Sequence, residues 1–218
     1  MANNTSDVQT RYHVAVEGNI AVGKSTFIKH LQDRLSDKAE ILFEPLDKWT
    51  NLKGVNLLQE MYANPIQRSF HTQSYIQLTM AINQQTPVDK PIKVMERSLE
   101  SGKFVFVKAM LEEGHIDQTE FDILDEWYNW LKQRNPPVNE IIYLRSTPQV
   151  ALERLINRNR SEESSVTLHY LESIHKLYDQ WLLNSSVPVT IIDQNQSLLN
   201  TISAADKLAD KFLFNISQ

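Results

Sequence analysis

The stretch Tyr12-His13-Val14-Ala15-Val16-Glu17-Gly18-Asn19-Ile20-Ala21-Val22-Gly23-Lys24-Ser25 decides the fold of this chain. Its apolar first half predicts a buried strand. The second half completes the pattern GxxxxGK[ST], and residues 24–36 predict a helix directly behind it. Glycines in such a loop let backbone N–H groups surround phosphate oxygens, and the lysine reaches the β- and γ-phosphates. A chance glycine-rich turn would not explain the strand before the pattern and the helix after it. The stretch therefore predicts a nucleotide-binding P-loop.

Strand and helix patterns alternate along the rest of the chain without a linker or an internal repeat. We expect further strands at residues 39–43, 91–95, 140–144 and 187–192. Helices are expected from Pro65 with Asn64 as N-cap, from a capping box of Asp117 and Glu120 to about residue 134, from Thr147-Pro148, and from Ser197 onward. Such alternation is typical of a parallel sheet with helices on both faces. The pattern predicts one α/β domain over residues 1–218 with a five-stranded parallel sheet.

Composition narrows the classes of protein to which this chain can belong. Its 218 residues are 41% hydrophobic, which is enough for a sizeable core, and the formal net charge is −5. The acidic balance argues against a protein that binds nucleic acid along its phosphates. The absence of cysteine excludes disulfides and thiolate metal sites, and the six histidines show no metal-ligand spacing.

The N-terminal segment and the apolar runs bear on location. Residues 1–11 are polar and rich in Asn and Thr, so we expect them to be flexible. They resemble neither a secretory signal nor a transit peptide. No apolar stretch reaches the length needed to cross a bilayer, and we expect no membrane partner. These features predict a cytoplasmic or nuclear location, with a mitochondrial one if a longer precursor exists.

A carboxylate follows the second predicted strand at Glu44. Ligands of such folds bind beyond the carboxyl ends of the strands, so Glu44 is expected to lie near the P-loop. There it could orient an attacking hydroxyl and accept its proton. Glu44 would repel a second anion, which favours a neutral hydroxyl acceptor over one that already carries phosphate. As an isolated residue, a solvated glutamate at a strand end would be the commoner explanation.

The third predicted strand ends in Glu96-Arg97-Ser98. Glu96, together with the hydroxyl of Ser25, offers the oxygen ligands that Mg²⁺ prefers. Arg97 can pair with Glu44 and later with the newly formed phosphate, because its planar guanidinium matches both anions. A structural ion pair is the alternative interpretation for such a tripeptide.

Three arginines follow the fourth predicted strand. Arg154 and Arg158 share a helix face, and Arg160 comes just beyond. A mobile cluster of this kind can close over a triphosphate and neutralise the charge that develops during transfer. We therefore expect a lid over residues 153–163, although a solvated charged face is the common explanation of such a run.

A P-loop by itself leaves several functions open. A GTPase-type switch needs a DxxG segment, but the residue three positions before each of the five glycines is Ala, Ile, Asn or Leu, and NKxD is also missing. The remaining enzymes are a kinase for a small neutral acceptor and, as the alternative, a thymidylate-type nucleoside-monophosphate kinase. A regulatory domain that only binds nucleotide would need a damaged Lys24, Glu44 or Arg97, and all three are present.

Several segments, in order and in spacing, resemble the deoxyribonucleoside kinase family. They are EGNIAVGKS, FEPLDKW, GVNLLQEMY, TQSYIQLTM, MERSLESGKFVF, DEWYNWL, IIYLRSTPQVALERL and RSEES. The likeness runs from about residue 12 to about residue 193, and is strongest to the insect multisubstrate and mitochondrial-type thymidine kinases. It implies a P-loop kinase fold that transfers the γ-phosphate of ATP, with Mg²⁺, to the 5′-hydroxyl of a deoxyribonucleoside. It also implies a homodimer joined through helices beside the sheet.

The resemblance assigns a role to each matching position. Its catalytic residues correspond to Lys24, Glu44 and Arg97, and its metal ligands to Ser25 and Glu96. The ATP site corresponds to Gly18, Asn19, Ala21, Gly23, Lys24, Ser25, Thr26, Arg154, Arg158 and Arg160. The nucleoside site corresponds to Glu44, Trp49, Tyr62, Gln73, Met80, Arg97, Gly102, Phe106 and Glu163, with Tyr62 and Glu163 on the sugar 3′-hydroxyl and Trp49 and Phe106 as aromatic walls.

Three positions bear on the choice of nucleoside. An amide such as that of Gln73 offers a donor and an acceptor, and can turn over to match thymine or cytosine. Met80 and Gly102 resemble the thymidine-accepting branch of the family, which leaves room for a 5-methyl group. Thr72 departs from the family, because the insect enzyme commonly has Phe there, and loss of one aromatic stack costs on the order of 1 kcal/mol. We expect thymidine and deoxycytidine as the favoured substrates, with purines also accepted.

Overall fold

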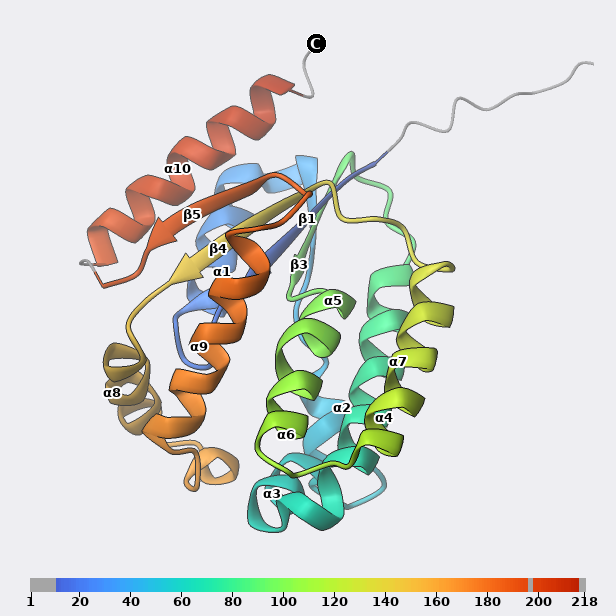
Figure 1. The fold of residues 1–218 in the computed structure, drawn as a ribbon. Coiled ribbons are helices and arrows are strands. Elements are labelled where there is room, and N and C mark those ends of the chain that lie inside the picture. Colours follow the sequence, from blue (N-terminus) through green and yellow to red (C-terminus); the bar gives the residue numbers. More distant parts are fainter. Residues whose placement is uncertain (1–10, 196–197, 216–218) are drawn as a thin grey trace, which may run out of the picture.

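The computed structural model describes residues 11–195 and 198–215, and its centre is one parallel sheet (Figure 1). The strands are β1 (Tyr12–Glu17), β2 (Ala39–Leu42), β3 (Ile92–Glu96), β4 (Glu140–Arg145) and β5 (Val189–Asp193). They pair in the order β2-β3-β1-β4-β5, and all four pairings are parallel. The predicted α/β fold with a five-stranded parallel sheet is confirmed.

Helices connect successive strands. The α-helices are α1 (Lys24–Leu35), α2 (Leu46–Thr50), α3 (Leu57–Ala63), α4 (Pro65–Gln85), α5 (Leu99–Ser101), α6 (Lys108–Glu112), α7 (Gln118–Lys132), α8 (Pro148–Arg158), α9 (Leu168–Leu182) and α10 (Leu198–Asn215). Two 3₁₀ turns, η1 (Ser36–Lys38) and η3 (Ser161–Glu163), and one π-helical segment, η2 (Gly102–Val107), complete the set.

The sheet is buried on both faces, as the apolar runs of its strands predict. Val14 and Val16 of β1 point to the face that α1 and α10 cover, where Phe27 and Phe212 join the same apolar cluster. Ala15 points to the opposite face, which η2, α6, α8 and α9 cover. The two helix layers are visible in Figure 1 on either side of the strands. Alternation along a single strand therefore divides the core into two halves.

A further layer of helices extends beyond the sheet (Figure 1). The helices α4 and α7 lie side by side and pack on α2 and α5 through a cluster around Trp49, Met80 and Leu99. The helix α3 closes the lower end of this layer and contacts η3. The arrangement places α2, α3 and α4 opposite the carboxyl end of the sheet, where ligands of such folds bind.

Most predicted boundaries agree with the structure to within two residues, including the capping box of Asp117 and Glu120 at the start of α7. The prediction for Asn64 is wrong in one respect. It precedes Pro65 at the start of α4, but its side chain makes no capping hydrogen bond. Asn64 also directly follows α3 as its C-cap, where its N–H bonds to the carbonyl of Glu60, so two helix ends constrain it. The predicted flexible segment falls almost wholly in residues 1–10, and Ser197 also lies outside the described residues; α10 begins at Leu198.

Candidate active site

A cavity of about 540 Å³ lies between the carboxyl end of the sheet and the outer helices. One end is formed by the P-loop and arginines of α8, the other by apolar and aromatic side chains of α2, α3, α4 and η2. Its lining comprises Ile20, Ala21, Val22, Gly23, Lys24, Ser25, Thr26, Glu44, Leu46, Trp49, Leu58, Met61, Tyr62, Gln73, Ile76, Glu96, Arg97, Ser101, Gly102, Phe106, Arg154, Arg158, Arg160, Glu163, Tyr170, Gln194 and Thr201. Most of the residues that the sequence singled out therefore meet in one place.

The P-loop is held by its own hydrogen bonds. The Lys24 ammonium donates to the carbonyls of Asn19 (2.8 Å) and Gly18 (3.2 Å). The Asn19 side-chain amide donates to the carbonyl of Leu171 on α9 at 2.8 Å, which anchors the loop to a distant helix. A Cβ at Gly18 would lie 2.5 Å from the Leu144 carbonyl oxygen, so only glycine fits there. Gly18 and Asn19 thus shape the loop from behind and do not line the cavity.

Lys24 is buried in a charged surrounding. Burial, and then the neighbouring Arg97, lower the pKa of its ammonium to about 7, against the opposing effect of Glu44 and Glu96. A bound anion would reverse this balance, because phosphate oxygens favour the charged ammonium. The side chain is thus suited to hold a phosphate group that arrives from outside.

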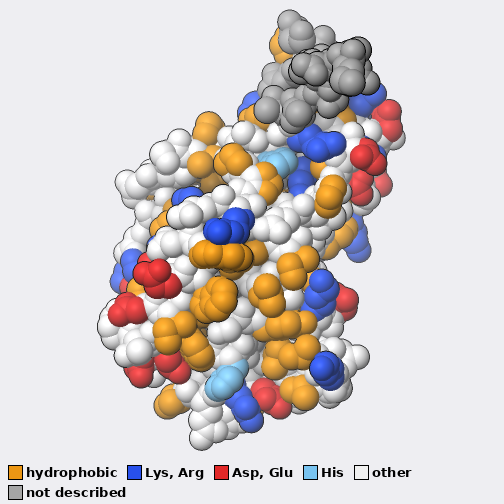
Figure 2. All heavy atoms as spheres, turned by 90° about the vertical axis from the view of Figure 1, so that its right-hand side faces the viewer, with side chains coloured by type: hydrophobic (Ala, Val, Ile, Leu, Met, Phe, Trp, Pro, Cys, Tyr) orange, Lys and Arg blue, Asp and Glu red, His pale blue; other side chains and the backbone are white. Residues whose placement is uncertain are grey.

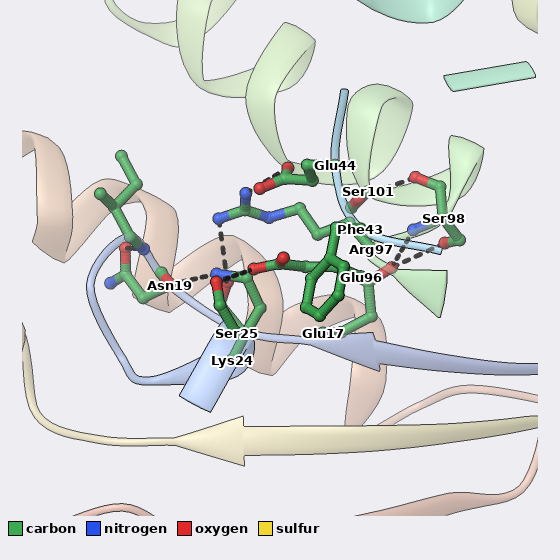
Figure 3. A network of polar contacts seen from close by, with 12 residues as sticks. Glu17, Asn19, Lys24, Ser25, Phe43, Glu44, Glu96, Arg97, Ser98 and Ser101 are labelled. Atoms are coloured by element: carbon green, nitrogen blue, oxygen red, sulfur yellow. Dashed lines mark hydrogen bonds and ion pairs between the residues drawn. The ribbon is translucent and has the colours of Figure 1, made fainter. Parts of the chain in front are cut away.

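Ser25 and Glu96 lie beside each other at the phosphate end. The Ser25 hydroxyl donates to a carboxylate oxygen of Glu96 at 2.8 Å (Figure 3). Hydroxyl and carboxylate oxygens are ligands that suit Mg²⁺, which usually keeps several waters and substrate phosphates in its shell. Across residues 11–195 and 198–215, no three His, Asp or Glu side chains form a metal cluster. The pair therefore fits a magnesium ion that is held jointly with a nucleotide.

Glu44 and Arg97 meet at the middle of the cavity. Nη1 of Arg97 donates to Oε1 of Glu44 at 2.5 Å, and both side chains are about nine-tenths buried. Figure 3 shows the guanidinium directly beneath the carboxylate. The pairing that the sequence anticipated is thus present, and Arg97 holds the Glu44 carboxylate in one orientation at the cavity wall.

The apolar end of the cavity has a few polar groups directed into it. Gln73 of α4 is buried, and its Oε1 atom accepts no hydrogen bond from the described residues. Trp49 is held by a bond from its Nε1 to Thr79 (2.8 Å), and Phe106 lies with its ring 4.8 Å from the Arg97 guanidinium carbon. Gln73 lines the cavity with an amide that makes no hydrogen bond through its oxygen, so this amide can turn to meet a polar group of a ligand.

Tyr62 and Glu163 approach each other from α3 and η3. Burial, and then the charge of Glu163, raise the pKa of Tyr62 well above its usual value, so the phenol stays protonated. Glu163 accepts a hydrogen bond from Arg158, and Arg160 lies 3.7 Å from its other oxygen. The two groups offer a hydroxyl and a carboxylate on the same side of the cavity.

Two positions do not contact the cavity as the sequence analysis expected. Met80 is not among the residues that line the cavity. It packs instead in the apolar cluster around Trp49. Ile76, one turn earlier on α4, takes its place in the lining. The expected gap in the wall at Thr72 is absent too, because Thr72 is buried behind the lining and its hydroxyl donates to the Leu57 carbonyl (3.3 Å). The rotation of α4, set by its packing on α7, decides which residues face inward.

Comparison with known proteins agrees with this geometry. The deoxynucleoside kinase family model matches residues 14–216. This chain belongs to the deoxynucleoside kinase family. Among its relatives, human mitochondrial thymidine kinase 2 is 33% identical over 92% of this chain and 77% of its own length. Chicken deoxycytidine kinase 2 is 32% identical over 93% of this chain and 87% of its own length. Xenopus laevis mitochondrial deoxyguanosine kinase is 31% identical over 91% of this chain and 87% of its own length.

The chain is thus an ATP-dependent deoxynucleoside kinase, and the thymidylate-type alternative is not supported.

The arginine cluster has a defined arrangement in the kinase. Arg154 donates to the carbonyls of Val22 (3.0 Å) and Gln194 (2.8 Å), so it ties the P-loop to the segment after β5. Arg158 and Arg160 instead hold Glu163. Each of the three arginines therefore has a defined partner, while Arg158 is also exposed to solvent.

The sequence analysis missed two buried residues of the kinase that contact Arg97 or its neighbours. Glu17, the last residue of β1, accepts hydrogen bonds from the N–H and the hydroxyl of Ser98. Burial raises its pKa to about 7 against the effect of these bonds. Tyr178 of α9 bonds both Glu17 and Arg97. A carboxylate at the carboxyl end of the first strand, directly before Gly18, was the available signal for Glu17; the sequence offered none for Tyr178.

The described helices also bear on membrane association. Between residues 11 and 195 and between 198 and 215, no helix is both long and apolar enough to cross a membrane.

Proposed function

We propose that Glu44 is the general base of this kinase. Its carboxylate would accept the proton of the nucleoside 5′-hydroxyl while that oxygen forms a bond to the γ-phosphorus and the bond from phosphorus to the bridging oxygen of ADP breaks. The observation that carries the proposal is the Arg97–Glu44 contact of 2.5 Å in the cavity wall, between the P-loop and Gln73. Arg97 orients the base and is well placed to contact the phosphate that forms beside it.

The phosphate end of the cavity would hold ATP. Lys24 would bind the β- and γ-phosphates, while Ser25 and Glu96 would hold Mg²⁺, which neutralises charge on the transferred group when it is bound. Arg158 and Arg160 are available to the same phosphates once they release Glu163. We propose that residues 153–163 act as a lid in this way, with Arg154 as the fixed end because it bonds to Val22 and Gln194.

The apolar end would hold the nucleoside. Gln73 reads the base edge with its amide, since the side chain lines the cavity and offers an oxygen to a donor and an NH₂ group to an acceptor. Trp49 and Phe106 enclose the base, and Tyr62 with Glu163 binds the 3′-hydroxyl. We propose thymidine and deoxycytidine as preferred substrates, because one amide that can turn over serves both pyrimidines. Purine deoxynucleosides are proposed as weaker substrates. In support of a broad acceptor range, the relatives of this chain include kinases named for thymidine, deoxycytidine and deoxyguanosine.

The test is Mg·ATP-dependent turnover of thymidine, deoxycytidine, deoxyadenosine, deoxyguanosine and dTMP by the wild type and Glu44→Gln. We expect the two pyrimidine nucleosides to lead, and kcat of the variant to fall by about 10²–10⁴-fold. Glu40→Gln serves as the matched control, since Glu40 lies on β2 and outside the cavity lining. Retained kcat in Glu44→Gln would contradict the role of Glu44 as the base. Turnover of dTMP alone would contradict the proposal that the acceptor is a nucleoside.

We also propose that the kinase is one domain over residues 1–218 and a homodimer. In support of one domain, helices from both ends of the chain cover the same sheet face. In support of a dimer, α4 and α7 expose apolar side chains, and Figure 2 shows such side chains gathered on the face that carries these helices. The exposed set is Leu78, Ile82, Ile123, Trp127 and Trp130. Exposed apolar patches of this kind commonly mark protein interfaces.

Light scattering at several concentrations tests the dimer. The wild type is expected at twice the chain mass, and Trp127→Glu at the chain mass. Ile66→Glu, an exposed site of the first turn of α4, is the control. A monomeric wild type would overturn the proposal. The cytoplasmic or nuclear location stays a prediction of the sequence.

A further inference from the structure

Arg97 makes more contacts than a partner of Glu44 needs. Besides Glu44, its guanidinium donates from Nε to the Tyr178 hydroxyl (3.1 Å) and from Nη2 to the Gly18 carbonyl (3.2 Å). Its backbone has a φ of +59°, a conformation that residues other than glycine rarely adopt. Three hydrogen bonds in different directions and an unusual backbone together leave the guanidinium a single position.

The Tyr178 hydroxyl links Arg97 to a second carboxylate. It donates to Oε2 of Glu17 at 3.1 Å, and these two residues are 161 positions apart in the sequence. An arginine can only donate hydrogen bonds, so the hydroxyl must accept from Arg97 and give its own proton to Glu17. The order of the bonds is therefore fixed: guanidinium to phenol, phenol to carboxylate.

Both members of this link are rigidly held. The Tyr178 side chain is fully buried, stacks on Tyr143 at 5.8 Å between ring centroids and on Trp181 at 6.1 Å, and meets Phe106 edge-on. The other oxygen of Glu17 accepts from the N–H (2.8 Å) and the hydroxyl (2.6 Å) of Ser98. Figure 3 shows dashed lines that join Glu17 to Ser98, to the right of the Glu44–Arg97 pair.

We propose that Glu17 and Tyr178 are positioning residues that hold Arg97 on Glu44 during phosphoryl transfer. The inference rests on the proposed role of Glu44 as the base. When Glu44 accepts the proton of the 5′-hydroxyl, it loses its negative charge and its attraction for Arg97 weakens. The Glu17–Tyr178 pair keeps its bond to Nε of Arg97 at this moment, so the guanidinium stays beside the forming phosphate.

A purely structural role for the pair would have different consequences. Loss of core hydrogen bonds would lower stability but leave the turnover of the folded enzyme unchanged. A positioning role acts on turnover and only through Arg97. Misplacement of a catalytic group by a fraction of an ångström to 1 Å reduces turnover by up to about 100-fold.

The experiment compares Tyr178→Phe and Glu17→Gln with the wild type, with Mg·ATP and thymidine varied separately. We expect kcat to fall by about 10- to 100-fold, with both KM values changed by less than about threefold. Tyr143→Phe is the matched control. It removes the hydroxyl of the stacked neighbour, which donates to Asp179 and does not touch Arg97. Its kcat is expected to equal that of the wild type.

A double-mutant cycle shows whether the effect passes through Arg97. In an Arg97→Ala background, Tyr178→Phe should cause no further loss of kcat, because the guanidinium that it positions is gone. A loss of the same factor in both backgrounds would overturn the proposal, as would an unchanged kcat in both Tyr178→Phe and Glu17→Gln. Circular dichroism checks folding, and if one of these variants fails to fold, the other carries the test.

The same assay separates this inference from the proposed function. Full activity of Glu44→Gln overturns both the role of Glu44 as base and the positioning role of Glu17 and Tyr178. A large loss of kcat in Glu44→Gln without any loss in Tyr178→Phe and Glu17→Gln overturns the positioning role alone.

Discussion

The two ends of the cavity are built in opposite ways. The phosphate end consists largely of the consecutive residues 20–26. The Lys24 ammonium already bonds to two carbonyls, and Asn19 anchors the loop to α9 from behind. The nucleoside end is assembled from α2, α3, α4, η2 and η3. There Gln73 has a buried oxygen with no partner among the described residues.

The difference reflects what each end has to recognise. A triphosphate is bound through charge and backbone N–H groups, which a short local motif can supply. A nucleoside is selected by the shape of an apolar pocket and a few placed polar groups, which only distant segments together can form. If this is right, substitutions at the two ends should affect different kinetic constants.

The largest effect is expected at the phosphate end. Lys24→Met removes the only side-chain charge of the P-loop, and we expect kcat to fall by about 10²–10³-fold, because the charge developing on the phosphates loses a fixed partner. Binding of thymidine to the free enzyme, measured by calorimetry, should stay within about threefold of the wild type. A matching loss of thymidine affinity would show that the two ends are not independent.

The next effect concerns Met80, which the sequence placed in the nucleoside site and the structure places behind it. Met80→Ala is expected to lower the free energy of unfolding by about 3 kcal/mol through a cavity beside Trp49. Met61 is equally buried but lines the cavity, so Met61→Ala should lose similar stability and also raise KM for thymidine. Urea unfolding and steady-state kinetics check both. A changed preference between thymidine and deoxycytidine in Met80→Ala would show that Met80 contributes to the nucleoside site after all.

A smaller effect is expected for the base-reading amide. Gln73→Leu should raise KM for thymidine and deoxycytidine by about 10- to 100-fold, since the polar edge of the base is left unpaired, while KM for ATP stays unchanged. Gln77→Leu is the control, because Gln77 lies one turn on, is equally buried and is outside the described lining. Equal KM changes in both variants would contradict base reading by Gln73.

The smallest effect is a dependence of stability on pH. Since burial lowers the pKa of Lys24 from 10.5 to about 7, the unfolded chain binds a proton between these values that the folded chain lacks. Stability from this group therefore rises with pH in that window, by at most about 1.4 kcal/mol per pH unit. In urea unfolding without nucleotide, the free energy of unfolding of the wild type should increase relative to that of Lys24→Met as the pH rises from about 7 to 9. A constant difference would argue against a buried, uncharged Lys24.

The sequence by itself determined the phosphate end, the sheet and the meeting of Glu44 with Arg97. These follow from local patterns: a contiguous P-loop, apolar strands, and the rule that the carboxyl ends of parallel strands share one edge. The same rule would have placed Glu17 there as well, since it ends β1.

Only the tertiary structure decided which side of α4 forms the nucleoside end. The helix buries mostly polar residues, among them Thr72, Gln73 and Gln77, so no apolar stripe marks its inward face. Packing on α7 sets its rotation, which brings Ile76 to the cavity and Met80 to the core. Tyr178 reaches Glu17 for the same kind of reason. A contact across 161 residues is made by the docking of a helix on a sheet, and spacing along the chain carries no record of it.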